Sequence, residues 1–166
     1  MIQEKEFNNK ALEKLHKSAQ SEINFSLHAK KIDHDIRQLG AAMYNLWLPE
    51  TQIMPYIVHP REEILGLVYG RYQQVEGDVV GRGVLIATPE RVLLIDKKPL
   101  YTKTAEIAYR VISAVTYSKV LFIGNVTIHT RMGKINVRTF NQKCAYNFVE
   151  AIEAILFKDE SMTYQE

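Results

Sequence analysis

A group of basic residues near the end of the chain has the spacing that could bind an anion. The segment from Val126 to Arg138 alternates apolar with polar residues on both sides of a Met132-Gly133 turn. This alternation predicts an antiparallel hairpin with one buried and one solvent-exposed face. The exposed face carries the basic residues His129, Arg131, Lys134 and Arg138. An acidic partner or an anionic head group could bind there, or the basic residues could simply protect an edge hairpin from pairing with other chains.

The histidines and the single cysteine have no spacing that is typical of a metal site or an activated nucleophile. His28 and His34 are six residues apart and therefore fall on different faces of a helix, and no pair matches His-x-x-x-His or Cys-x-x-Cys. Cys144 precedes the apolar stripe of the last predicted helix by one residue, which favours a half-buried structural thiol. The sequence therefore predicts a non-enzymatic protein with no metal and no other cofactor.

Composition and charge limit the class of protein. Hydrophobic residues form 46% and charged residues 24% of the 166 residues, which suffices for a packed core. The net charge of +2 is too small to argue for nucleic-acid binding, although residues 59–157 hold 13 Lys and Arg against 9 Asp and Glu, a surplus of +4. The chain has no apolar run near the ~20 residues of a membrane span, and its start does not resemble a signal peptide. With a single cysteine, we expect a cytoplasmic protein.

The first 48 residues are predicted to be helical, and the apolar stripe is clearer in the second part of this segment, from Ile32 onward. Its members recur at steps of three and four and are Ile32, Ile36, Leu39, Met43, Leu46 and Trp47. Gly40 is a weak point inside this helix, and Pro49 is expected to end it. The stripe could pack on the rest of its own chain, mediate self-association, or meet another partner or a membrane surface.

Three prolines make residues 48–61 the best candidate for an irregular connector. They are Pro49, Pro55 and Pro60. We therefore expect a helical N-terminal extension and connector at residues 1–58, a β domain at 59–158 and a polar tail at 159–166.

After the connector, the apolar period changes from 3.6 to 2, which predicts seven short strands. The hairpin at 83–97, with Thr88-Pro89-Glu90-Arg91 at its turn, supplies the second and third of them. The first strand is expected at 64–72. The fourth is expected to end near 105–109, the fifth to span 111–117, and the sixth and seventh to form the hairpin around Met132-Gly133. Asn141 then caps a helix whose apolar positions are Ala145, Phe148, Val149, Ile152, Ile155 and Leu156. Tyrosines 101, 109 and 117 and Phe122 are interpreted as core or cross-strand packing.

Three segments of this β region carry a resemblance to a known family. They are Glu63-Ile64-Leu65, the run from Gly83 to Thr88 followed by Arg91-Val92-Leu93-Leu94-Ile95, and Glu106-Ile107-Ala108-Tyr109 with Ile112-Ser113-Ala114-Val115. Over about Pro60 to Phe157 the chain resembles the bacterial pleckstrin-homology-like (PH-like) family, in particular its YokE-like branch. The resemblance implies an α+β, PH-like fold: a seven-stranded bent antiparallel β-barrel or sandwich, capped by a C-terminal helix and here preceded by a helical extension.

The resemblance does not extend to the lipid site of phosphoinositide-binding relatives. Those proteins place a cluster of Lys and Arg on the first two strands and the loop between them. Here Arg71 and Arg82 flank the acidic Glu76 and Asp78, which repel an anionic head group. Thr88 and Arg91 are interpreted as residues that shape the turn rather than as ligands.

Two functions remain open from the sequence. The first is a non-catalytic interaction or scaffolding module that self-associates through its helical extension or its sheet edges, with a second copy or another protein as partner. The alternative is a peripheral binder of anionic ligands or lipid head groups, such as a weakly bound anionic membrane surface. Its site would be the basic face formed by His129, Arg131, Lys134 and Arg138. Nucleic acid is not an expected partner.

Overall fold

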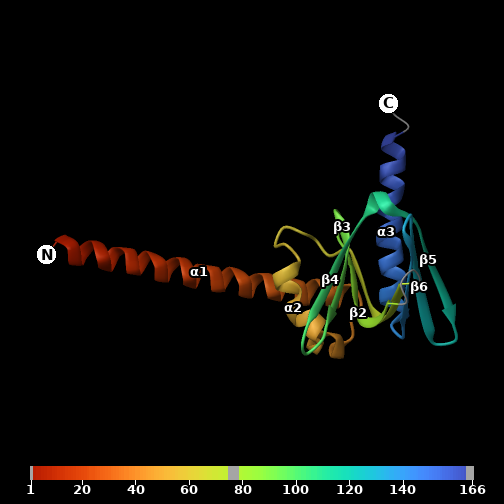
Figure 1. The fold of residues 1–166 in the computed structure, drawn as a ribbon, viewed down its shortest axis with the longest axis horizontal. Coiled ribbons are helices and arrows are strands. Elements are labelled where there is room, and N and C mark those ends of the chain that lie inside the picture. Colours follow the sequence, from red (N-terminus) through yellow and green to blue (C-terminus); the bar gives the residue numbers. More distant parts are fainter. Residues whose placement is uncertain (1, 75–78, 164–166) are drawn as a thin grey trace.

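The computed structural model describes the backbone of residues 2–74 and 79–163 and the side chains of residues 13–74 and 79–158 (Figure 1). A helical N-terminal region precedes the strands, and one helix follows them. The elements are α1 (Ile2–Gln38), the 3₁₀ helix η1 (Met43–Trp47), α2 (Pro49–Ile57), β1 (Gly66–Gln74), β2 (Val79–Ala87), β3 (Arg91–Lys97), β4 (Thr102–Ala108), the 3₁₀ helix η2 (Tyr109–Val111), β5 (Ile112–Val120), β6 (Ile123–Thr130), β7 (Gly133–Thr139) and α3 (Gln142–Thr163).

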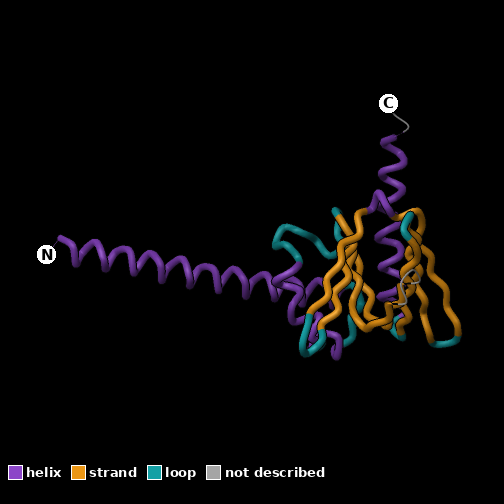
Figure 2. Tube along the Cα trace, viewed as in Figure 1, coloured by secondary structure: helices purple, strands orange, loops and turns teal. Residues whose placement is uncertain are grey.

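The seven strands form one antiparallel sheet in the order β4-β3-β2-β1-β7-β6-β5. The sheet bends strongly, and α3 lies inside the bend against β1, β5 and β6 (Figures 1 and 2). The prediction of a bent seven-stranded sheet capped by a C-terminal helix is therefore confirmed. The side-chain oxygen of Asn141 accepts a hydrogen bond from the backbone N–H of Cys144 at 3.1 Å, which caps α3 as expected.

The sheet bends where β1, which pairs with β2 on one side, begins to pair with β7 on the other. β1 pairs with β2 along its whole length, but it pairs with β7 only from Arg71 onward. The residue before this point is Gly70, where an added Cβ atom would lie 2.2 Å from the carbonyl oxygen of Arg138. Only a residue without a side chain allows so close an approach of two backbones. Gly70 therefore lets β1 join the two halves of the sheet.

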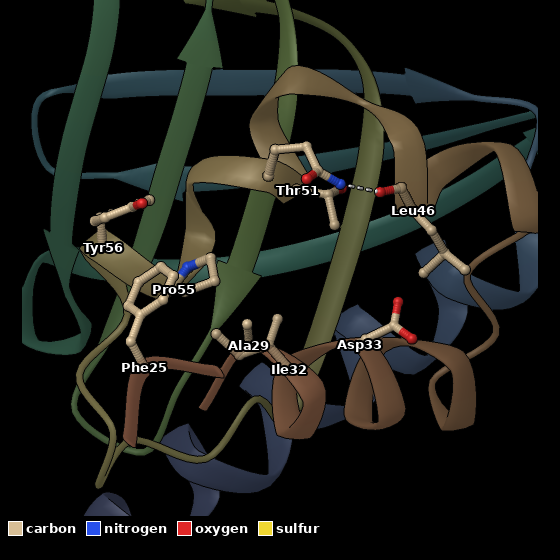
Figure 3. Close-up of a pocket in the computed structure, with 9 residues that line it drawn as sticks. Phe25, Ala29, Ile32, Asp33, Leu46, Thr51, Pro55 and Tyr56 are labelled. Atoms are coloured by element: carbon tan, nitrogen blue, oxygen red, sulfur yellow. Dashed lines mark hydrogen bonds between the residues drawn. The ribbon is translucent and has the colours of Figure 1, made fainter. Parts of the chain in front are cut away.

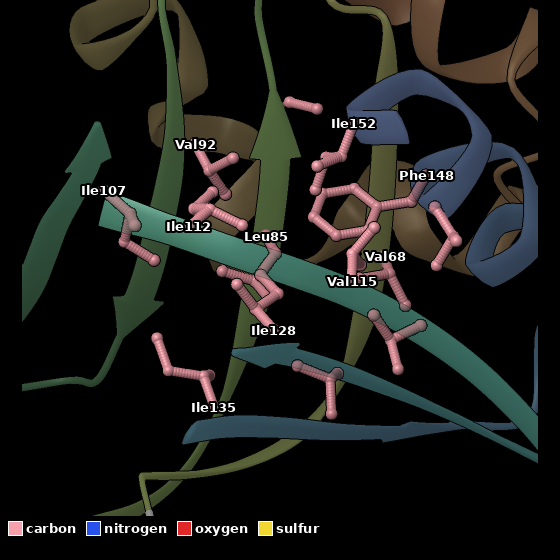
Figure 4. Close-up of a cluster of buried hydrophobic side chains, with 14 of the residues drawn as sticks. Val68, Leu85, Val92, Ile107, Ile112, Val115, Ile128, Ile135, Phe148 and Ile152 are labelled. Carbon is pink, nitrogen blue, oxygen red and sulfur yellow. The ribbon is translucent and has the colours of Figure 1, made fainter. Parts of the chain in front are cut away.

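The concave side of the sheet and α3 enclose the inner core. Phe148 and Ile152 of α3 are completely buried against Val68, Leu85 and Ile128 (Figure 4). These α3 residues follow helical spacing, while the strand residues occupy every second position, so the apolar periods of the sequence match the packing.

The opposite face of β1, β2 and β3 is also buried, because the N-terminal helices cover it. Ile32 and Ile36 of α1, Leu46 of η1 and Met54 of α2 pack on this outer face. β2 and β3 are consequently buried on both faces, which explains why residues 83–88 and 92–96 contain no solvent-exposed position. The N-terminal region thus builds a second core on its own β domain.

Two predictions for the N-terminal region were wrong. The helix does not run to Trp47: α1 ends at Gln38, and Gly40 has a φ of +96°, a left-handed conformation that terminates helices. Pro49 begins α2 rather than preceding an irregular connector, because proline is tolerated in a first turn, where the backbone N–H has no partner within the helix. At the other end of the chain, α3 continues past Lys158 to Thr163, so the predicted polar tail begins as helix.

The Thr88–Arg91 turn is built as predicted. The hydroxyl of Thr88 donates to the carbonyl oxygen of Arg91 at 3.0 Å, and the Thr88 backbone N–H donates to the same oxygen at 3.0 Å. The Arg91 guanidinium binds both carboxylate oxygens of Glu62, at 2.8 and 3.0 Å, and also contacts Glu106. The guanidinium holds the pKa of Glu62 below its usual value. Thr88 therefore shapes the turn, and Arg91 ties the turn to Glu62 and Glu106.

Candidate partner-binding surfaces

The N-terminal part of α1 leaves the body of the protein as a single extended helix (Figures 1 and 2). We call residues 2–27 the helical arm. Every residue from 13 to 27 is exposed, including Leu15 at 66%, Ile23 at 54% and Leu27 at 60%. Most helical stability in proteins comes from packing, so a helix that leaves these apolar side chains exposed is incomplete as a folded element.

The base of the helical arm is fixed to the body between α1 and α2. His28 is buried, and its Nε2 atom lies 2.9 Å from the carbonyl oxygen of Val58. The rings of Phe25 and Tyr56 are in contact, with 4.6 Å between their centroids. Beside them lies a pocket of about 250 Å³ (Figure 3). Its lining is Phe25, Ala29, Ile32, Asp33, Leu46, Thr51, Gln52, Pro55 and Tyr56.

The six residues of the predicted association stripe do not form one surface. Ile32, Ile36 and Leu46 are buried in the outer core, and Leu39 is partly buried beside them. Met43 and Trp47 are exposed, at 64% and 79%. The break of the helix after Gln38 separates these two from the α1 residues, because the helical spacing on which the stripe depended is lost. Of the predicted stripe, only Met43 and Trp47 are accessible to a partner.

The four predicted basic residues lie on β6, on β7 and in the turn between them, as expected. His129 and Lys134 are directly opposite each other across the two strands, and Arg131 lies in the turn. Arg138 lies further along β7, opposite Asn125. Between these positions, the Thr127 hydroxyl hydrogen-bonds to the Asn136 side chain at 2.9 Å. The outer side of β6 and β7 is therefore polar and basic.

The sheet extends this basic surface with two arginines that the sequence prediction left out. Arg138 pairs in register with Arg71 of β1, and Arg71 pairs with Arg82 of β2. Directly opposed residues point to the same face of a sheet, so three guanidinium groups form a row across three strands. Among the side chains that the structure describes, no salt bridge involves any of the three. We call His129, Arg131, Lys134, Arg138, Arg71 and Arg82 the cationic face.

The register of the first hairpin could have revealed the arginine row. A hairpin register in which Gln74 faces Val79 places Arg71 opposite Arg82, which is the observed pairing. The acidic residues Glu76 and Asp78, on which the argument against an anion site rested, lie outside the described residues. The segment from 107 to 149 strengthens the basic character, since it holds six Lys and Arg and not one Asp or Glu.

The described residues offer little that could carry out a reaction. No group of three or more His, Cys, Asp or Glu side chains within residues 13–74 and 79–158 could hold a metal ion. Cys144 is fully buried rather than half-buried, its Sγ atom lies 3.5 Å from the carbonyl oxygen of Leu39, and burial raises its pKa to about 11. A thiol of this kind is protonated near neutral pH and is a poor nucleophile.

The aromatic residues predicted to pack divide into two groups. Tyr109 is buried, with its hydroxyl donating to the carbonyl oxygen of Thr88, and Tyr117 meets Tyr146 edge-on with 6.2 Å between ring centroids. Tyr101 and Phe122 are instead exposed, at 57% and 79%, because both lie in turns between strands. Among the helices of the described chain, none has the length and apolar character needed to cross a membrane.

The chain matches one family of known proteins and is similar to several solved structures. The family model described as bacterial PH domain matches residues 58–154, so α1, η1 and α2 lie outside the match. No curated protein matches the chain. Among solved structures, the Vps36 N-terminal PH domain is similar with a TM-score of 0.50 and 13% identity, over 63% of this chain and 86% of that one. The C-terminal domain of an unknown protein from Leishmania infantum has a TM-score of 0.46 and 18% identity, over 70% of this chain and 99% of that one.

Proposed function

Because the chain belongs to the bacterial PH domain family, we propose that it is a non-catalytic interaction module whose helical arm pairs with the arm of a second copy. The observation that carries this proposal is the exposure of every residue from 13 to 27. Leu15, Ala19, Ile23 and Leu27 recur every four residues and form an apolar stripe along the arm. Packing this stripe against another helix removes it from water and stabilises the arm.

The charges of the helical arm support a second copy as the partner. Residues 2–27 contain four Lys and four Glu, so the arm has no net charge from these residues. Two identical arms therefore approach without net repulsion, and Lys and Glu can alternate across their contact. A highly charged partner, such as an anionic surface, gains nothing from a neutral arm.

Self-association can be tested with the full chain at tens of micromolar. We expect multi-angle light scattering to give twice the monomer mass for the wild type, and the monomer mass for a Leu15→Glu/Ile23→Glu variant, because two carboxylates from each arm would be buried in the contact. The matched control is Leu100→Glu, which changes an exposed leucine of the β3–β4 turn and should remain a dimer. A wild type that is strictly monomeric at this concentration contradicts the proposal.

A second candidate function is the binding of an anionic partner on the cationic face. The row formed by Arg82, Arg71 and Arg138 supports it, because neighbouring guanidinium groups repel one another until an anion binds. Within the segment from 107 to 149, which contains β6 and β7, no Asp or Glu offsets the charge of Arg131, Lys134 and Arg138. Neither feature serves the packing of the core.

Vesicle co-sedimentation at low salt tests the cationic face. An Arg71→Gln/Arg138→Gln variant should bind vesicles containing phosphatidylglycerol roughly tenfold more weakly or worse than the wild type, since each basic residue near an anionic surface contributes about 1 kcal/mol. The control removes the same charge elsewhere, at Lys17 and Arg61, both exposed, and should bind within about twofold of the wild type. Equal loss in both variants would show that only net charge matters.

A further inference from the structure

The turn between β5 and β6 is apolar at the positions where a turn normally exposes polar residues. We call Val120, Leu121, Phe122 and Ile123 the apolar tip. Val120 is 69% exposed, Leu121 and Phe122 are each 79% exposed, and Ile123 is 40% exposed. Single exposed apolar residues are common, but four in succession at the end of a hairpin are not, and an exposed patch of this kind marks a contact site.

The backbone of the apolar tip strengthens this argument. Leu121 has a φ of +52°, the left-handed conformation that glycine and asparagine adopt most easily. Leucine at this position costs conformational energy and exposes its side chain to water. Both costs are unnecessary for the fold, because an asparagine or glycine would make the same turn. Both costs argue that a contact outside the chain is the reason for an apolar side chain here.

The surroundings of the apolar tip are basic. Lys119 precedes it directly, and Gln142 at the start of α3 donates a hydrogen bond to the carbonyl oxygen of Leu121 at 3.5 Å. Phe140, 79% exposed, precedes the same end of α3. No Asp or Glu occurs between Glu106 and Glu150. An apolar tip that follows a lysine, within a segment of chain that has no acidic residue, has the charge complementary to an anionic surface.

The shape of the hairpin distinguishes between possible partners. The β5–β6 hairpin extends past the rest of the β domain (Figure 1), so the apolar tip is a convex projection and not a groove that could receive a peptide. We propose that the apolar tip inserts into the interface of a bilayer that contains anionic lipid, with Lys119 at the level of the head groups. Aromatic and aliphatic side chains favour that depth, and lysine stems reach back to the phosphates.

This inference rests on the second candidate function, because the cationic face would bring the protein to the same surface, but it concerns different residues. The test uses the full chain and two kinds of vesicle, phosphatidylcholine alone and phosphatidylcholine with phosphatidylglycerol. A Leu121→Asn/Phe122→Gln variant keeps the turn, since asparagine accepts the left-handed conformation. It should bind the anionic vesicles at least tenfold more weakly than the wild type. The control Leu100→Asn, at a leucine that is 96% exposed, should bind like the wild type.

A fluorescent reporter separates insertion from mere proximity. The only tryptophan, Trp47, is exposed and lies outside the β5–β6 hairpin, so a Trp47→Phe/Phe122→Trp variant carries its single tryptophan at the apolar tip. Its emission should shift to shorter wavelength on anionic vesicles and be quenched by lipids with bromine on their acyl chains. Bound protein with an unshifted emission overturns the proposal.

The remaining outcomes distinguish this proposal from the cationic-face function. If Leu121→Asn/Phe122→Gln binds like the wild type while Arg71→Gln/Arg138→Gln does not, insertion is wrong and the cationic face stands. If the wild type binds neither kind of vesicle, both proposals fail. If it binds an acidic polypeptide such as polyglutamate through the apolar tip but no vesicle, the partner is a protein and the bilayer proposal is overturned.

Discussion

A fragment of residues 59–158 should fail to form a stable fold, although it contains almost all of the bacterial PH domain match. Without the N-terminal helices, the outer face of β1, β2 and β3 is exposed to water. That face presents Leu67, Tyr69, Val84, Ile86, Leu93 and Ile95, none of them more than 7% exposed in the full chain. We expect the fragment to aggregate, or to unfold at a much lower urea concentration than the full chain.

The size of this effect follows from the side chains that the fragment lacks. Ile32, Ile36, Leu46 and Met54 are each nearly or completely buried on the outer face. At about 1.5–3 kcal/mol for each, their burial contributes roughly 6–12 kcal/mol as an upper bound, which is comparable to the whole stability of a typical domain. The predicted boundary between an extension at 1–58 and a β domain at 59–158 would then cut through a shared core.

A second fragment tests whether the loss of stability comes from the shared core and not from the loss of the arm. Residues 28–166 lack the helical arm but keep the packed end of α1, together with the buried His28. This fragment should unfold at nearly the same urea concentration as the full chain, because the described residues that it lacks, 13–27, are all exposed and only Phe25 among them is seen in ring contact with the body. If the fragment 59–158 were as stable as the fragment 28–166 and bound no dye specific for exposed apolar surface, the shared core would be wrong.

A Gly70→Ala substitution should lower the free energy of unfolding by about 3 kcal/mol, at the upper end of single-residue effects. The new Cβ atom would lie 2.2 Å from the carbonyl oxygen of Arg138 and 2.9 Å from a methyl group of Val137. The first of these is backbone and cannot rotate away, so β1 and β7 must separate where the sheet bends. Urea denaturation followed by tryptophan fluorescence or circular dichroism measures the loss.

Gly124 provides the matched control for this substitution. Its added Cβ atom would lie 3.2 Å from the edge of the Tyr117 ring, a side chain that can move by a few tenths of an ångström. We expect Gly124→Ala to change stability by about 1 kcal/mol or less. Equal effects at the two positions would contradict the role given to Gly70. Because Gly70 precedes Arg71, the Gly70→Ala variant should also weaken the pairing of Arg71 with Arg138.

The fold of the β domain could be predicted from sequence because its signals are local. Alternation in 126–138 fixes a hairpin, and the spacing from Ala145 to Leu156 fixes a helix. The N-terminal layer was harder, since Gly40 and Pro49 each have two meanings. Gly40 can weaken a helix or end it, and Pro49 can stop one helix or begin another. A clue lay in residues 83–97, whose almost continuous apolar runs indicate strands that are covered on both faces.

The residues of the candidate binding surfaces also differ in how well their positions could be predicted from sequence. His129 and Lys134 could be placed together because they flank one short turn, whereas Arg138 and Arg71 are brought together by strands far apart in the sequence. Their adjacency depends on the strand order, which periodicity alone does not provide. Exposure was equally difficult to predict for Phe122, since an aromatic residue beside β-branched ones has the composition of a core strand.

The length of the helical arm sets how far apart two paired β domains can lie. Its 26 residues, 2–27, rise 1.5 Å each and therefore extend ~39 Å from the β domain. Two arms paired in parallel place both β domains at the same end of a rigid rod, where both apolar tips can reach one surface. Two arms paired antiparallel hold the domains at opposite ends, so the pair could bridge two surfaces but could not bind one surface twice. The direction of pairing thus decides between avidity and tethering.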